Sequence, residues 1–417
     1  MLSRLLGHST LPKQYQSNFI HLYLDIAWFG VLSGSALNFV NIYATRLGAS
    51  GFQIGLLAAM SAVVSLFLAI PAGRWIEKRH MGRAVFWSSV FFRIGYILWI
   101  PLPWFFDAQG QILALIIITF LMAIPMTPLG VGFNALFAEA VPDEHRAQVA
   151  SIRNMTVAVA FMGSSLISGY ILDHAPFPAG YQIIFLIGAV SALMSSFHLF
   201  FVRPMPGRST APPSAPQADL VSSEKSARGF ASALRLDIWR TPFRNVLFAL
   251  FVMHLTHALT TPIYPLFNVH VLHLNDDNIG IGTALFYFTM LLGSFRFGRV
   301  ANYLGNKKVT GFGMLGMSIY PLLLAFAQSV GHYYVISLLG GFTWAFVNGA
   351  FANYMLERIP ATDRPSHLAW YNIILNIALL SSSLLAPLIA GEIGLAGALI
   401  LFGVLRILAG LGILRWG

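Results

Sequence analysis

Charged residues are scarce in this chain. Only 10% of its 417 residues are Asp, Glu, Lys or Arg, whereas 57% are hydrophobic. A soluble domain of ordinary composition has roughly 25% charged residues, so a chain of this length has too few charges to cover a water-facing surface. The composition therefore excludes an ordinary soluble protein and predicts one whose surface faces lipid.

Cysteine is absent, which excludes a disulfide framework, a thiolate metal site and a cysteine nucleophile. Carboxylates are also few, with 15 Asp and Glu against 25 Lys and Arg. The sequence contains no HExxH motif and no evident nucleophile–base pair. It therefore predicts no metal and no cofactor, and it does not favour an intramembrane enzyme.

Twelve apolar runs are long enough to cross a bilayer core, which takes about 20 helical residues. Helices satisfy their own backbone hydrogen bonds in lipid, and these runs are too long and continuous for β-barrel strands. We expect no cleavable signal peptide, because the N-terminal stretch before the first run is polar and basic. The fold class predicted is an all-α integral membrane protein. Its expected helices are 17–45, 51–73, 84–105, 111–138, 147–171, 180–202, 245–272, 279–301, 309–329, 333–356, 366–390 and 394–414.

Basic residues predict the orientation of these spans, because cytoplasmic segments are enriched in Lys and Arg. With the N-terminus in the cytoplasm, all Lys and Arg residues except Arg46, Arg93 and Arg406 fall on cytoplasmic segments or helix ends. We therefore expect a multi-pass protein of the cell (inner or plasma) membrane with both termini cytoplasmic. This topology accounts for the net charge of +10, so no nucleic-acid partner is predicted.

Residues 203–241 differ from the rest because they are rich in Pro, Ser and charge, a composition typical of a flexible linker. Near its end, Phe230, Leu234 and Ile238 are spaced four residues apart, which predicts a short amphipathic helix on the membrane surface. The linker divides the chain into an N-terminal domain, 1–202, and a C-terminal domain, 242–417, with six expected spans each.

One motif occurs twice, between the fourth and fifth spans of each half. The stretch E-x2-P-x3-R-x7-N begins at Glu139 and recurs 218 residues later at Glu357. A second pair of stretches follows the second span of each half. These are "GRWIEKRHMGR" at 73–83 and "GRVANYLGNKK" at 298–308, with an offset of 225. Landmarks that keep their order at similar offsets indicate that the two halves are internal repeats.

On these stretches the chain resembles the major facilitator superfamily of transporters, in its prokaryotic form, over essentially its whole length. The family has a G-x-x-x-D-R-x-G-R pattern after its second span, and the second half here reads Gly298-x-x-x-Asn302-x-x-Gly305-x-Lys307, with Asn302 in place of Asp. The first half matches more loosely, with Glu77 in place of Asp and a longer loop. The resemblance implies twelve transmembrane helices in two pseudo-symmetric six-helix bundles.

The resemblance also implies that these stretches form a cytoplasmic gate. A carboxylate there can accept hydrogen bonds from an arginine and from a helix N-terminus, and glycine lets two backbones approach closely. Because Asn302 is uncharged, we expect the gate contacts of the second half to be weaker than those of the first half. The alternative interpretation is a set of topology signals with ordinary helix capping. The predicted gate residues are Gly73, Glu77, Arg83, Glu139 and Arg146 in the first half, and Gly298, Asn302, Gly305, Glu357 and Arg364 in the second.

Ionisable side chains inside spans cost ~2.5–3.5 kcal/mol each on insertion scales and therefore predict a functional site. Asp25 and Arg93 lie about 12–15 Å deep at 1.5 Å per residue. They form either a static strut or a coupling pair in which Asp25 takes and releases a proton. His254 and His257 share a helix face and suit proton coupling, substrate binding or a structural role. We expect Arg406 to extend to the membrane interface.

Polar side chains on other spans are weaker candidates for the same transport site, since interhelical hydrogen bonds are common in membranes. Trp344 and Asn348 share a face of the tenth span. Other candidates include Asn38 and Asn41.

Together these features predict a secondary active transporter that moves a small organic solute by alternating access. Proton coupling is inferred from Asp25 and the two histidines. The alternative is proton-linked export of drugs or amphiphilic compounds, although the fifth span lacks the Gly-Pro ending of that branch. Other classes, a transporter-like sensor or an intramembrane enzyme, are not favoured. We expect a monomer whose partners are a small-molecule substrate and membrane lipid.

Overall fold

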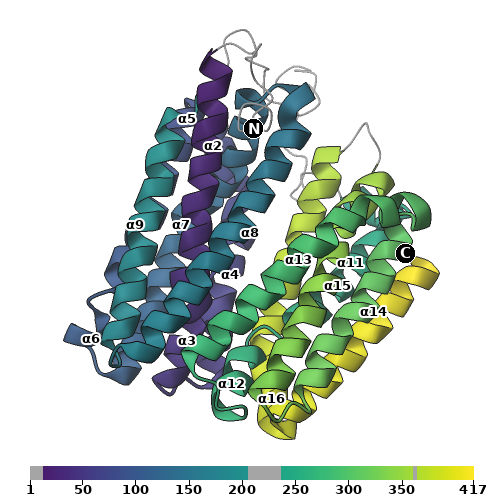
Figure 1. The fold of residues 1–417 in the computed structure, drawn as a ribbon. Coiled ribbons are helices and arrows are strands. Elements are labelled where there is room, and N and C mark those ends of the chain that lie inside the picture. The colour runs from purple at the N-terminus through teal and green to yellow at the C-terminus, as the bar shows by residue number, and fades with distance from the viewer. Residues whose placement is uncertain (1–12, 205–235, 360–363) are drawn as a thin grey trace. The chain divides into compact units, whose positions relative to one another are not determined.

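The computed structural model describes residues 13–204, 236–359 and 364–417, and within these ranges the secondary structure is entirely helical (Figure 1). The helices of the N-terminal part are α2 Lys13–Leu32, η1 Ser33–Leu37, α3 Asn38–Arg46, α4 Gly51–Glu77, α5 Met81–Ile94, η2 Gly95–Trp99, α6 Leu102–Phe105, α7 Ala108–Ala140, α8 Asp143–His174 and α9 Ala179–Phe201. Those after the linker are η3 Leu236–Arg240, α11 Phe243–Ala258, α12 Ile263–His270, α13 Asp276–Leu304, α14 Asn306–Leu324, α15 Val330–Arg358 and α16 Arg364–Trp416.

Nine helical runs in the described residues are long and apolar enough to cross a membrane. The last, Ser366–Trp416, has 51 residues and would extend about 75 Å at 1.5 Å per residue. A hydrocarbon core is only ~30 Å thick, and Gly394 interrupts this run with a φ of 77°, so the run supplies two passes. Helices α5 with η2, and α14, occupy the expected third and ninth spans. The helices are therefore consistent with the twelve that the sequence predicts.

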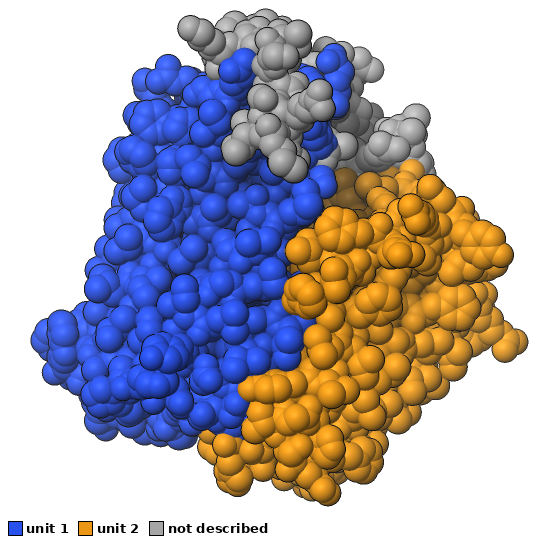
Figure 2. Space-filling model, viewed as in Figure 1, with its two compact units in different colours: residues 1–210, 274–287 blue, residues 211–273, 288–417 orange. Residues whose placement is uncertain are grey.

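The chain divides into two compact units, coloured separately in Figure 2. Unit 1 comprises residues 1–210 and 274–287, and unit 2 comprises residues 211–273 and 288–417. The first part of α13 thus belongs to unit 1, although it follows the linker in the sequence. The predicted domain boundaries remain a prediction, because most of the linker 203–241 lies outside the described residues.

In unit 1, helix α2 lies against two other long helices. Helix α2 packs against α8 and α9, and α7 packs against α4 and α5. Apolar side chains from several of these helices meet in one buried cluster, which includes Phe19, Leu22, Val85, Leu136 and Val149. This packing fixes α2 between its neighbours and so determines which side chains surround Asp25.

In unit 2, α14 packs against α15 and α16, and α11 packs against α16. The core cluster includes Phe243, Leu250 and Met314, and Ile238 of η3 is buried within it. Of the predicted surface helix, Phe230 and Leu234 lie outside the described residues. The expected seventh span is broken between α11 and α12, at Leu259–Pro262, and this break bears on the candidate site below.

Candidate functional site

Asp25 of α2 lies at the centre of a buried ionic cluster in unit 1. Its Oδ2 atom lies 3.3 Å from both terminal nitrogens of Arg153. Its Oδ1 atom accepts a 2.5 Å hydrogen bond from the Ser195 hydroxyl and lies 3.8 Å from Nη2 of Arg93. Asp25 is only 3% exposed. A buried carboxylate is tolerated here because cations and a hydroxyl contact both of its oxygens.

Arg93 of α5 is the partner that the sequence predicts for Asp25, but it is the more distant of the two arginines. Its Nη1 donates to the Ser196 hydroxyl at 3.1 Å, and Ser196 contacts Ser89 at 2.7 Å. Its Nε is buried and has no hydrogen-bond partner among the described residues. Arg93 is therefore hydrogen-bonded to Ser196, and its Nε is left without an acceptor among the described residues.

Arg153 of α8 is the closer partner, and the sequence reasoning missed it. That reasoning began the fifth span at residue 147 and counted Arg153 as a helix-end residue. Helix α8 begins at Asp143, so Arg153 lies ten residues, or about 15 Å, into the helix. Its Nη1 also donates to the Leu22 carbonyl at 2.6 Å, and its guanidinium stacks 4.8 Å over Phe133. Counting from the acidic first turn of α8 would have found it.

The cluster carries two arginines and one aspartate, so its formal charge is +1. It borders a cavity of about 460 Å³. Asp25, Arg93 and Arg153 all line this cavity, and apolar and aromatic side chains form most of the remaining wall, including Phe29, Tyr96, Trp99, Met122 and Phe133. A cavity with one excess buried positive charge is suited to an anionic group.

Two histidines that the sequence reasoning did not single out lie near Asp25. His21 precedes it by one helical turn on α2, and His198 follows Ser195 on α9. Their Nδ1 atoms lie 3.0 Å apart, and the His21 ring stacks on Phe201 at 4.7 Å. A hydrogen bond between two imidazole nitrogens requires one donor and one acceptor, so the pair can share a proton.

In unit 2 the predicted histidines have separate partners. His254 of α11 contacts the Tyr371 hydroxyl through Nε2 at 3.0 Å. His257 stacks almost parallel on Trp344 of α15, with ring centroids 4.8 Å apart, and its buried Nδ1 has no partner among the described residues. The structure therefore brings together His257 and Trp344, which the sequence singled out separately.

Arg406 is buried, and the expectation that it extends to the membrane interface is wrong. It is 1% exposed and donates to the carbonyls of Met317 at 3.0 Å and His257 at 3.0 Å. It also donates to the Thr260 hydroxyl at 2.8 Å. Carbonyls at the end of α11 lack helical partners because the span breaks there. Arg406 supplies donors to that break.

The remaining pore candidates are dispersed. Asn348 of α15 is exposed. Asn38 of α3 donates to the Ser165 hydroxyl at 3.2 Å, while the buried Oδ1 of Asn41 has no partner among the described residues. Asn38 thus acts as a contact between α3 and α8.

A polar clasp joins the start of α13 to the rest of unit 1. Arg46 of α3 forms a 2.8 Å ion pair with Asp276, whose other oxygen accepts a 2.8 Å bond from the Tyr181 hydroxyl. Nearby, Gly169 and Gly280 cross so closely that a Cβ on Gly280 would lie 2.7 Å from the Ser165 carbonyl. Arg46 is one of the three basic residues that the predicted topology does not place on cytoplasmic segments or helix ends.

The first gate stretch caps a helix. Arg146 of α8 donates to the Val141 carbonyl at 3.2 Å and to the Ala138 carbonyl, at the end of α7. It also forms a 2.6 Å ion pair with Asp143 and, within the described residues, none with Glu139. Capping by a basic residue at a helix C-terminus accounts for the arginine locally. Its predicted role in a gate remains a prediction.

Other first-half gate residues lie where α4 meets α5. Gly73 is inside α4 and has open space where a Cβ would lie, so no close contact within unit 1 requires a glycine there. Glu77 is the last residue of α4, and its side chain lies outside the description. Arg83 is exposed on the first turn of α5.

In the second half, Gly305 is the residue before α14 and has a φ of 81°, a left-handed conformation that favours glycine. Glu357 accepts a 2.6 Å hydrogen bond from Asn306. Asn302 is exposed on α13, and Gly298 has open space at its Cβ position. The side chain of Arg364 lies outside the description.

Comparisons with known proteins agree with this architecture. The family model described as Major Facilitator Superfamily matches residues 26–253 and 246–416. The chain is 24% identical over 266 residues to the cis,cis-muconate transport protein of Acinetobacter baylyi, covering 62% of this chain and 61% of that protein. It is 26% identical over 137 residues to multidrug resistance protein 2 of Bacillus subtilis, covering 33% and 34%. The chain thus spans about three fifths and one third of the lengths of these two relatives.

Solved structures share the fold at low identity. The xylose transporter XylE from E. coli, in a partially occluded inward-open conformation, superposes with a TM-score of 0.69 at 14% identity, covering 96% of this chain and 97% of that chain. The nucleoside transporter NupG gives a TM-score of 0.65 at 12% identity, covering 97% of this chain and 99% of that chain. At this identity the likeness extends to the fold alone.

Proposed function

The chain belongs to the major facilitator superfamily, and from this premise we propose that it carries a small organic acid across the cytoplasmic membrane by proton-coupled alternating access. Members of this family are transporters, and this chain is a membrane transporter rather than an enzyme. The substrate, the coupling ion and the position of the two termini in the cytoplasm are parts of the proposal.

The observation that carries the choice of substrate is the excess positive charge at Asp25, Arg93 and Arg153. Two arginines face the same cavity with one carboxylate, and Nε of Arg93 has no partner among the described residues. A substrate carboxylate would supply both the missing charge and the missing acceptor. The named activity of the Acinetobacter relative, muconate transport, supports an organic acid.

Proton coupling is proposed for Asp25, because it is the carboxylate at the centre of this cluster. Protonation would release Asp25 from Arg153, and the freed arginine could then bind a substrate anion. His21 lies one helical turn from Asp25 on α2, and His198 lies one turn from Ser195 on α9. The Nδ1 atoms of these histidines are 3.0 Å apart, and the pair could supply the proton. Substrate anion and proton would therefore enter the cluster together.

Alternating access requires gates on both sides of the membrane. We assign the outer gate to the clasp of Arg46, Asp276 and Tyr181, and the cytoplasmic gate to the two repeated stretches around Arg146 and Glu357. The clasp holds the start of α13 against the other helices of unit 1. Its opening would free the start of α13 from those helices. The protein is proposed to work as a monomer in the cytoplasmic membrane.

Export of amphiphilic compounds is the second candidate. Its support is the apolar and aromatic wall of the cavity at Asp25 and the name of the Bacillus relative, a multidrug resistance protein. An exporter of cationic drugs would need an excess of carboxylates at its site, whereas this cluster has an excess of arginine. The charge therefore favours the organic acid.

Uptake into proteoliposomes under an imposed pH gradient tests the proposal. We expect gradient-driven uptake of a carboxylate such as cis,cis-muconate, and no uptake of a neutral sugar or nucleoside. Asp25→Asn should abolish the dependence on the gradient, whereas Asp173→Asn, at an exposed carboxylate, serves as the matched control. Transport of neutral solutes alone would contradict the choice of an acid, and gradient-driven uptake that survives Asp25→Asn would contradict proton coupling through Asp25.

A further inference from the structure

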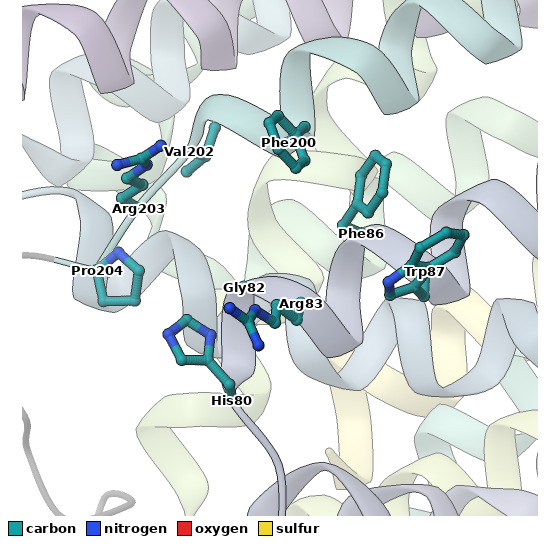
Figure 3. A pocket seen from close by; sticks show the side chains of 9 residues that line it. All are labelled: His80, Gly82, Arg83, Phe86, Trp87, Phe200, Val202, Arg203 and Pro204. Atoms are coloured by element: carbon teal, nitrogen blue, oxygen red, sulfur yellow. The ribbon is translucent and has the colours of Figure 1, made fainter.

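A second cavity lies at one end of unit 1, where α5 begins and the chain leaves α9 (Figure 3). Its volume is about 580 Å³, and it has no part in the cluster at Asp25. The lining residues come from two segments that are far apart in the sequence. They are His80, Gly82, Arg83, Phe86, Trp87, Phe200, Val202, Arg203 and Pro204.

The cavity is positively charged. Arg83 approaches it from α5 and Arg203 from the chain after α9 (Figure 3), and both side chains are exposed. No Asp or Glu is among the described residues that line it. Arg83 and Arg203 are the permanent cations among the described residues that line it.

The surroundings of the cavity are those of a lipid-facing surface. Trp87 is 53% exposed and Phe200 is 54% exposed, although both side chains are large and apolar. In a membrane protein such side chains contact lipid, and tryptophan is enriched at the level of the headgroups. The arginines therefore lie where phospholipid phosphates are found.

An apolar groove continues from this cavity along the helices. It has a volume of about 730 Å³ and shares His80, Arg83 and Trp87 with the first cavity. Farther along, Phe91 of α5 faces the part of α7 that contains Pro125 and Pro128. From Arg83 to Phe91 the helix rises about 12 Å, a distance that an extended acyl chain can follow.

From the cationic end and the adjoining groove, we propose that this surface binds one anionic glycerophospholipid. Its phosphate would lie between Arg83 and Arg203, and one acyl chain would run along the groove between α5 and α7. A free anion would use only the cationic end, and a zwitterionic lipid would bring its own cation to the arginines. Basic pockets between transmembrane helices are known headgroup sites. The inference does not depend on the transported substrate.

Lipid binding to the purified full-length protein tests this site. The probes are phosphatidylglycerol and phosphatidylcholine with identical long acyl chains, dihexanoyl phosphatidylglycerol, and inorganic phosphate. Binding is measured by native mass spectrometry and by the shift in melting temperature. We expect preferential binding of the long-chain anionic lipid. The double variant Arg83→Gln/Arg203→Gln should weaken that binding roughly tenfold or more, at about 1 kcal/mol per basic residue.

The matched control is Arg240→Gln/Arg244→Gln, which removes two exposed arginines from unit 2. It should leave the preference for phosphatidylglycerol unchanged. An equal loss in both double variants would mean a general charge effect and would overturn the assignment. Equal stabilisation by inorganic phosphate or by the short-chain lipid would overturn the acyl-chain part, and equal binding of phosphatidylcholine would overturn the requirement for an anion.

Discussion

Removing Arg93 should leave the protein folded and abolish binding of the proposed carboxylate substrate. Removing Asp25 should instead lower the stability of the fold. Asp25 contacts Arg153 twice at 3.3 Å and Arg93 once at 3.8 Å. Arg93→Met leaves a neutral pair, Asp25 with Arg153. Asp25→Asn leaves two buried arginines and no carboxylate. The two variants therefore change the charge of the cluster in opposite directions.

The magnitudes follow from these distances. At an effective dielectric constant of about 20, attraction at 3.3 Å is worth ~5 kcal/mol and at 3.8 Å ~4 kcal/mol, before the cost of burial. Burial costs several kcal/mol for each ion. Arg93 has one carboxylate partner, at 3.8 Å, so its net electrostatic gain from the cluster is small. We expect Arg93→Met to change the free energy of unfolding by less than about 1 kcal/mol. Asp25→Asn should cost about 3–5 kcal/mol, as for a broken buried pair.

Thermal unfolding in detergent, with and without a bound carboxylate, measures both effects. We expect the melting temperature of Arg93→Met to be close to that of the original chain. Arg153→Met should melt at a lower temperature, and Asp25→Asn at the lowest. The double variant Asp25→Asn/Arg153→Met restores a charge of +1 and should recover part of the loss. If Asp25→Asn melts at the original temperature, or Arg93→Met is the least stable, the assignment of charges in the cluster is wrong.

Three further predictions concern other parts of the chain. Arg406→Met should lower the free energy of unfolding by about 2–4 kcal/mol, because it leaves carbonyls at the break of α11 unpaired; Arg406→Lys should recover less than half, since lysine lacks the guanidinium fork, and equal melting of all three proteins would contradict this role. Asp276→Asn should loosen the clasp proposed as the outer gate and so speed thiol labelling of Ser165→Cys. This cysteine would be the only one in the chain, because the sequence contains none. An unchanged labelling rate would argue against a gate there. Gly305→Ala should cost about 1–2 kcal/mol at its positive φ, whereas Gly298→Ala, inside α13 with open space at Cβ, should not destabilise the protein, and equal losses would contradict the conformational argument.

Most of the fold could be predicted from the sequence, because span length and repeat spacing are local properties. The break between α11 and α12 and the burial of Arg406 could not, because both depend on which helices pack together. Arg406 lies near the end of its span and looks free to extend to the interface. Only the packing of α11 against α16 shows that unpaired carbonyls lie within its reach.

The candidate site was predicted in part, for a similar reason. Depth along a span could be counted for Asp25 and Arg93, and the structure brings these two residues together. Arg153 was missed because the start of α8 was placed four residues late. The serines that hold the cluster carry no charge, so nothing in the sequence marks Ser195 or Ser196 as different from other small residues in α9.

The repeat itself indicates where specificity lies. At the offset of 218, Arg153 corresponds to Tyr371, and at the offset of 225, Arg93 corresponds to Ser318. A third pair of stretches, 46–55 and 273–282, aligns at an offset of 227, at which Asp25 corresponds to Val252. None of the three charges is repeated. The hydroxyl of Tyr371 instead contacts Nε2 of His254 at 3.0 Å. Of the repeated residues, Arg146 caps the end of α7, whereas Gly73 and Gly298 lie inside helices with open space at their Cβ positions. The proposed organic acid would therefore be recognised by the unrepeated charges of unit 1, whereas the candidate residues of unit 2 offer a hydrogen bond and aromatic faces.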